Sequence, residues 1–185
     1  MTRFMIYDET NAPEQSLQYL ESAKRRMGFV TTLNGVMAAS PELLAGYNSL
    51  SELFFKSSLP RDAKHVVLIA ASVENNCEYC VAAHSTIGLK SGLDAMTIDE
   101  LRSDAVLTDA KLEAIRQFTK SIVANRGWVS ELEVDEFLNA GYSQRNVFDA
   151  ILGVGMKTLS NYTNHIAHTP LDFAWKEQRW NGTGS

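Results

Sequence analysis

Apolar and polar residues follow each other along this chain in helix-like segments that end at typical helix-boundary residues. One segment begins at Pro13 and ends at Gly28, and proline at the start with glycine at the end is a common helix pattern. Ser40 and Pro41 mark the start of a second helix, because serine caps helices well and proline suits the first helical position. No stretch shows the sustained period-two alternation of a strand. The pattern predicts an all-α fold of about eight helices.

Further helix signals occupy the middle of the chain. A third helix is expected to start near Pro60 and to run through "AKHVVLIAASVEN", whose apolar residues cover almost the whole circumference and predict burial on most sides. The stretches Thr97–Glu100 and Ser130–Glu133 have the spacing of capping boxes. Another helix is expected to open at Thr108 and to stop at Gly127.

The last long segment is expected to open at Ser143 and to end before Pro170. Gly153 and Gly155 lie inside it and weaken a helix, so close packing against another helix is one explanation and a local kink is the other.

Polar residues near the end of this segment are weaker candidates for a site. Asn161 and His165 are four residues apart, and His168 follows at the next turn. They can line a pocket or a subunit contact, but capping and packing are the simpler explanation.

Composition and charge limit the classes of function that this chain can have. With 185 residues, of which 45% are hydrophobic and 21% charged, the chain is expected to form a single all-α domain over residues 1–185. The net charge of -5 and the lack of a basic stripe argue against nucleic-acid binding. No apolar run is long enough to cross a membrane, and the N-terminal residues do not read as a signal peptide. We therefore expect a cytoplasmic protein with no membrane partner.

Candidate chemistry is concentrated in "VENNCEYCVAAHS", residues 73–85, which holds both cysteines of the chain. Asn75-Asn76 interrupts the apolar run, so one helix is expected to end there and the next to begin. Cys77 would then lie in the first turn of the new helix, where the helix dipole and free N–H groups favour a thiolate. In the cytoplasm such a pair is catalytic, redox-sensing or metal-binding rather than a permanent disulfide.

Helical spacing places Cys77, Cys80 and His84 on one face, within roughly 60° of one another. His84 is one turn, about 6 Å, from Cys80 and about 10 Å along the axis from Cys77. A direct contact between the imidazole and a thiol is therefore easier for Cys80.

Three kinds of chemistry can use residues of this stretch. A structural zinc site needs four ligands, and Cys77, Cys80 and His84 supply three, with Glu74 as the only nearby fourth. The haem-attachment pattern fails because Val81, not histidine, follows the second cysteine. A dithiol with an adjacent base fits best: one thiolate attacks an oxidant, the other closes the disulfide, and the histidine moves protons.

The stretch "NNCEYCVAAHS" after an apolar helix resembles the carboxymuconolactone decarboxylase-like superfamily, in its AhpD-type alkylhydroperoxidase branch. The resemblance covers roughly Leu43 to Gly127, and the tail "GVGMKTLSNYTNHIAHTPLD" is similar to that of a further subgroup of the same family. It implies an AhpD-like helical bundle, assembly into dimers, trimers or hexamers, and thiol-dependent peroxidase or disulfide-reductase activity without a bound cofactor or metal.

The resemblance also implies roles for single residues. By analogy Cys80 is the peroxidatic thiol, Cys77 the resolving thiol and His84 a member of a proton relay. The family's relay glutamate is replaced here by His65, so we expect Glu74 to serve as the relay carboxylate. The argument from the helix terminus favours Cys77 as the attacking thiol, so the order of the two cysteines stays open.

The leading hypothesis is a thiol-dependent peroxidase or disulfide oxidoreductase that acts on a small hydroperoxide or disulfide. A thiol reductant protein would regenerate it, and the chain would form a homo-oligomer. Two alternatives remain: a carboxymuconolactone decarboxylase-like lyase, and a non-catalytic helical oligomer that senses redox state or binds a metal.

Overall fold

The computed structural model describes residues 2–182, and within them the chain forms nine α-helices, one 3-10 helix and no strand. The predicted all-α class and the number of longer helices are therefore confirmed. The elements are α1 (Glu14–Met27), α2 (Thr32–Met37), α3 (Pro41–Lys56), α4 (Arg61–Glu74), α5 (Glu78–Lys90), α6 (Ala95–Arg102), α7 (Ala110–Ala124), α8 (Glu131–Asn139), α9 (Gln144–Ala167) and η1 (Phe173–Gln178). None of the helices described is long and apolar enough to span a membrane.

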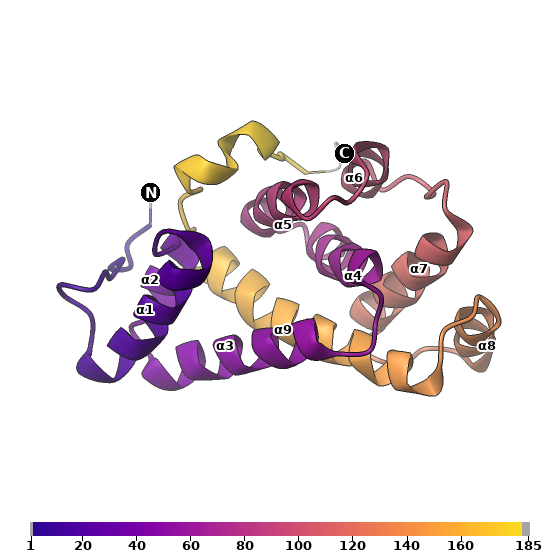
Figure 1. Ribbon diagram of the computed structural model, residues 1–185, viewed down its shortest axis with the longest axis horizontal. Helices are drawn as coiled ribbons and strands as arrows, with labels where there is room; N and C mark the ends of the chain where they lie inside the picture. Colours follow the sequence, from indigo (N-terminus) through magenta and orange to yellow (C-terminus); the bar gives the residue numbers. More distant parts are fainter. Residues whose placement is uncertain (1, 183–185) are drawn as a thin grey trace.

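Helix α4 forms the centre of the core, as its apolar circumference predicted. Every residue from His65 to Val73 is buried. Figure 1 shows α4 and α5 in the middle, α3 and α9 crossing below them, α1 and α2 at one end, and α7 and α8 at the other. Helix α9 packs against α3, α4 and α5, so its inner face meets the helix that carries the cysteines.

The predicted break at Asn75-Asn76 is confirmed. Helix α4 ends at Glu74, Asn76 has a left-handed φ of 51°, and Cys77 is the N-cap of α5. The Asn75 side-chain amide donates a hydrogen bond of 3.0 Å to Asn161 Oδ1 on α9. This contact ties the turn before the cysteines to the last long helix.

Capping was predicted correctly at some helices and wrongly at others. The box predicted at Ser130 forms, and Ser143, predicted only as a helix start, forms a further box. In each the serine side chain accepts a hydrogen bond from the third helical N–H. The box expected at Thr97 is wrong, because the Asp94 carboxylate one turn earlier already accepts a bond from the Thr97 N–H. Glu100 instead accepts bonds from the Thr108 N–H and hydroxyl.

The two glycines of α9 have different surroundings. A Cβ added at Gly153 would lie 2.6 Å from Phe54 Cε2 on α3 and 2.7 Å from Val67 Cγ1 on α4. Close helix packing, one of the two explanations considered for Gly153, is therefore confirmed. A Cβ at Gly155 would meet nothing within 4 Å, because Gly155 lies on the outer face.

This packing predicts the effect of adding one methyl group. Gly153→Ala is expected to destabilise the chain by about 1–3 kcal/mol, because its Cβ overpacks the junction of three helices. Gly46→Ala on α3 is the matched control, since nothing lies within 4 Å of its added Cβ. The control is expected to stabilise the chain by about 0.5–1 kcal/mol through helix propensity. Urea unfolding of both variants checks this, and equal shifts in the same direction would contradict it.

Candidate active site

Both thiols lie buried at the start of α5, in contact with polar side chains from α9. Cys77 is the N-cap and Cys80 lies in the first turn, and both are free cysteines. The Asn164 side-chain amide donates to both sulfurs, with Nδ2–Sγ distances of 3.2 Å to Cys80 and 3.8 Å to Cys77. The Ser160 hydroxyl oxygen lies 3.8 Å from Cys80 Sγ. The dithiol is thus embedded in hydrogen-bonding groups that come from a distant part of the sequence.

Lys157 adds a cation to this cluster. Its side chain is completely buried, and its Nζ has no conventional hydrogen-bond partner in the part of the chain that the structure describes. A buried ammonium is costly unless a negative charge compensates it. No carboxylate among residues 2–182 forms an ion pair with Lys157. The Cys80 thiolate is the counter-charge that the arrangement offers.

The two thiols differ strongly in acidity. Burial by itself would raise the pKa of Cys80, but the hydrogen bond with Cys77, the charge of Lys157 and the Ser160 hydroxyl outweigh it and hold that pKa well below its ordinary value. Hydrogen bonding to Cys80, together with burial, raises the pKa of Cys77. The surroundings therefore favour the thiolate on Cys80 over the thiolate on Cys77.

His84 lies one turn after Cys80 on α5, as the spacing predicted, and both side chains line the same cavity. Burial, with a smaller contribution from the Lys157 charge, holds the pKa of His84 well below its ordinary value. The imidazole is therefore neutral at physiological pH. Its role as a proton carrier stays a prediction, whereas the cation beside Cys80 is Lys157.

Glu74 is placed away from the thiols. Its carboxylate lies 3.7 Å from Lys120 Nζ, and both residues line a groove beside α7 that contains neither cysteine. His65, the alternative at the relay position, is buried with its ring centroid 6.3 Å from that of Phe55, and burial lowers its pKa. The structure thus brings Cys77, Cys80 and His84 together and leaves Glu74 outside, because the break at Asn75-Asn76 separates the two helices.

A mostly apolar cavity of about 300 Å³ leads to Cys80. Aromatic and aliphatic side chains from α1, α3, α5 and α9 form much of its wall, and Cys80, His84 and Lys157 supply the chemistry. The lining residues are Arg26, Met27, Thr31, Leu33, Asn34, Tyr47, Ser51, Phe55, Tyr79, Cys80, Ala83, His84, Ile87, Met156, Lys157 and Trp175.

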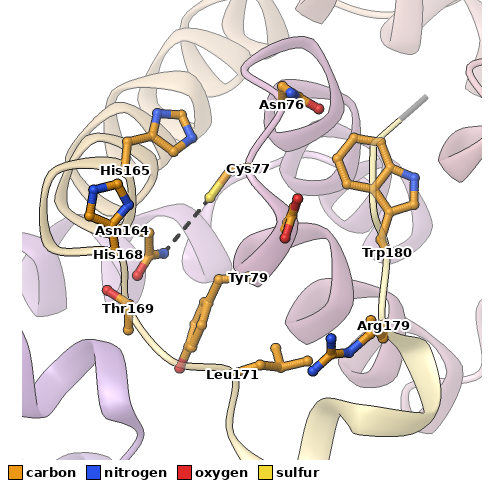
Figure 2. A pocket seen from close by; sticks show the side chains of 11 residues that line it. Asn76, Cys77, Tyr79, Asn164, His165, His168, Thr169, Leu171, Arg179 and Trp180 are labelled. Atoms are coloured by element: carbon orange, nitrogen blue, oxygen red, sulfur yellow. Dashed lines mark hydrogen bonds between the residues drawn. The ribbon is translucent and has the colours of Figure 1, made fainter. Parts of the chain in front are cut away.

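A second, more polar cavity of about 500 Å³ leads to Cys77 at the C-terminal end of α9. Figure 2 shows the Cys77 side chain pointing between His165 and His168 on one side and Trp180 on the other. Of the polar residues noted near the end of α9, the two histidines line this cavity, while Asn161 is buried and bonded to Asn75.

Lys157, Ser160 and Asn164 were missed by sequence reasoning, although a signal exists. They are buried at the spacing i, i+3 and i+7 on α9, in register with the core residues Gly153 and Met156. Polar side chains at core positions of an amphipathic helix call for a buried partner. Among residues 2–182 no group of three His, Cys, Asp or Glu side chains is arranged to hold a metal ion.

Comparison with known proteins shows a similarity over the segment that carries the cysteines. The model of the carboxymuconolactone decarboxylase family matches residues 41–120, which include both cysteines and His84. A search of the curated proteins gave no match.

Solved structures share the fold over nearly the whole chain. An uncharacterised peroxidase-related protein with an AhpD core from Ralstonia eutropha JMP134 superposes with a TM-score of 0.83 at 17% identity, over 94% of each chain. A peroxidase-related protein from Silicibacter sp. TM1040 gives 0.76 at 18% identity, over 89% of this chain and 88% of that one.

A third similar structure is a cysteine-to-alanine variant of the debrominase Bmp8 in complex with 2,3,4-tribromopyrrole. It has a TM-score of 0.81 at 14% identity, over 96% of each chain. The fold of this chain is thus shared with two peroxidase-related proteins and with a debrominase. Lys157, Ser160 and Asn164 lie outside the segment that matches the family model.

Proposed function

We propose that this protein is a thiol-dependent peroxidase in which Cys80 attacks and Cys77 resolves. The observation that carries the proposal is the buried Lys157 beside Cys80, which stabilises a thiolate on the wall of an apolar cavity. Thiolates, not thiols, are the nucleophiles of cysteine chemistry. The AhpD-like fold and the peroxidase-related proteins that share it support the same activity.

The reaction takes two steps. The Cys80 thiolate attacks the terminal peroxide oxygen, the O–O bond breaks, and the alkoxide takes up a proton, which leaves an alcohol and a sulfenic acid on Cys80. The Cys77 thiol then attacks the Cys80 sulfur, releasing water and forming the disulfide. Neutral His84 lines the same cavity as Cys80, so we assign it the proton transfers at Cys80. A thiol donor reduces the disulfide and completes the cycle.

The apolar cavity favours an organic hydroperoxide. Tyr47, Phe55 and Trp175 give its wall an aromatic character that suits an alkyl or aryl group better than water-like hydrogen peroxide. Peroxide consumption with a dithiol donor is expected to have a kcat/KM at least about tenfold higher for cumene hydroperoxide than for hydrogen peroxide. The reverse preference would contradict the assignment of this cavity. If the wild-type protein consumes neither peroxide, the proposed function is contradicted.

We also propose that the chain forms a homo-oligomer, a dimer, trimer or hexamer, through the outer face of α9. Phe148, Ile151, Tyr162 and Ile166 are large apolar residues that remain 48–66% exposed. At about 100° per residue they fall within roughly 60° on one face, together with Gly155. A second copy is the occupant that fits, because the stripe runs the length of a helix and the open glycine permits close helix approach.

A charge placed in this stripe is expected to separate the subunits. Ile151→Arg would bury an unpaired cation at the contact and weaken association roughly a hundredfold or more. Val106→Arg, at an even more exposed apolar residue outside α9, is the control and should leave assembly unchanged. Light scattering checks this, and a wild-type mass of 20.5 kDa at micromolar concentration would refute the oligomer.

A further inference from the structure

The two cavities reach different sulfur atoms. Within residues 2–182, the apolar cavity is lined by Cys80 and not Cys77, and the polar cavity is lined by Cys77 and not Cys80. Tyr79 lines both and forms part of the wall between them. Its hydroxyl donates to the Asp172 carboxylate and accepts from the Leu33 N–H at 3.3 Å, so the wall is anchored to the C-terminal segment and to α2. Access to each sulfur is therefore separate.

The chemistry of thiol–disulfide exchange favours one of the two cavities as the route by which a reductant reaches the disulfide. A thiolate that attacks one sulfur of a disulfide expels the other, and the more acidic thiol leaves faster. Attack on Cys77 expels Cys80, whose thiolate is stabilised by Lys157, Asn164 and Ser160. Attack on Cys80 would expel Cys77, where burial disfavours the thiolate and the Asn164 amide lies farther away, at 3.8 Å from Cys77 Sγ against 3.2 Å from Cys80 Sγ. Reduction through the polar cavity thus has the better leaving group.

The polar cavity carries one fixed charge of each sign. Arg179 and Glu78 both line it, both are exposed, and neither side chain forms an ion pair or hydrogen bond in the described part of the chain. His165 and His168 add exposed imidazoles at the rim, opposite Arg179 in Figure 2. A ligand with separate positive and negative groups complements such a lining better than one with a single charge.

We propose that the disulfide is reduced through this polar cavity by a zwitterionic low-molecular-weight thiol, one that carries both a carboxylate and an ammonium group. Arg179 receives the carboxylate and Glu78 the ammonium, and the thiolate is directed at Cys77. This rests on the proposed dithiol function, of which it supplies the reducing half.

The exchange balances in two steps. The first thiolate bonds to Cys77 Sγ as the Cys77–Cys80 bond breaks, which gives a mixed disulfide and the Cys80 thiolate. A second thiolate attacks the sulfur of the bound small molecule, which leaves as a symmetrical disulfide, and Cys77 takes up a proton. Two thiols are oxidised and one protein disulfide is reduced. The oxidant stays on the other side of the Tyr79 wall throughout.

The test uses full-length protein whose disulfide is formed with diamide, so it does not depend on peroxidase activity. Substoichiometric cysteine is added, the reaction is quenched with an alkylating agent, and fragment mass spectrometry locates both groups. The expected result is cysteine attached to Cys77 and the alkyl group on Cys80. Cysteine attached to Cys80, or failure of diamide to form the disulfide, would overturn the proposal.

Four thiols of different charge test the roles proposed for Arg179 and Glu78. They are cysteine, 3-mercaptopropionate, 2-aminoethanethiol and 2-mercaptoethanol. For each, the ratio of wild-type to variant reduction rate cancels the intrinsic reactivity of the thiol. Arg179→Gln is expected to slow the two carboxylate-bearing thiols about three- to tenfold, and Glu78→Gln the two ammonium-bearing ones by a similar factor. Cysteine alone responds to both variants.

Two controls complete the test. Neutral 2-mercaptoethanol should respond to neither variant, and Arg26→Gln, which removes a charge from the apolar cavity, should change none of the four rates. Equal effects of Arg179→Gln on all four thiols would overturn the assignment of a zwitterion. Normal peroxide turnover with cysteine attached to Cys80 would overturn this inference and leave the proposed function intact.

Discussion

Replacing Lys157 with methionine is expected to lower the rate of Cys80 alkylation at neutral pH by about a hundredfold, because a buried thiol without a nearby cation is almost fully protonated there. The Cys77→Ser background isolates the signal of Cys80. Iodoacetamide labelling across pH should show the inflection of Cys80 moving to higher pH in the variant than in the parent. Peroxide turnover should fall in parallel.

The stability of this variant separates the charge from a structural role. Methionine fills a similar volume without a buried ammonium, so the variant is expected to unfold at the same temperature or higher. The pKa of Cys80 is lower in the folded chain than in the unfolded one. Its thiolate therefore stabilises the fold at high pH, and that contribution is lost as the pH falls through the folded-state pKa. The variant should lack this pH dependence.

Lys120→Met is the matched control for the loss of a lysine. Lys120 Nζ lies 2.6 Å from the Asp104 carboxylate and 3.7 Å from that of Glu74, away from the thiols. Alkylation of Cys80 should be unchanged in this variant. An unaltered pH profile in Lys157→Met would instead assign the activation of Cys80 to the N-terminus of α5 or to His84.

Peroxide is expected to leave a sulfenic acid on Cys80 when Cys77 is replaced by serine, and almost none on Cys77 when Cys80 is replaced. The difference in initial dimedone labelling should be about a hundredfold, since the surroundings favour the thiolate on Cys80 and the apolar cavity opens to that sulfur. Fast labelling of Cys77 in the Cys80→Ser variant would give the opposite order, with the helix terminus dominant.

His84→Ala separates proton transfer from thiolate formation. Because His84 is neutral, its removal should leave the pH profile of Cys80 alkylation nearly in place, while Lys157→Met shifts it. Peroxide turnover should still fall about ten- to a hundredfold in His84→Ala, as for the loss of a general acid–base group. A shift of the alkylation profile in His84→Ala as large as that in Lys157→Met would contradict this division of roles.

Local sequence by itself determined the helices and the dithiol. The break at Asn75-Asn76, the caps at Ser130 and Ser143, and the shared face of Cys80 and His84 all follow from interactions within one or two helical turns. Spacing fixes such relations before the chain packs, so they could be predicted. The capping box expected at Thr97 failed because Asp94, only three residues away, competes for the same N–H.

The tertiary structure decided the electrostatics of the site. Lys157, Ser160 and Asn164 meet the cysteines across about eighty residues of chain, because α9 crosses α5 and buries its polar positions against it. The same packing directs Glu74 to Lys120 on α7 and keeps it from the thiols. No helical period links residues so far apart. Which thiol carries the charge therefore depends on how the helices pack, since burial and a neighbouring cation act through space.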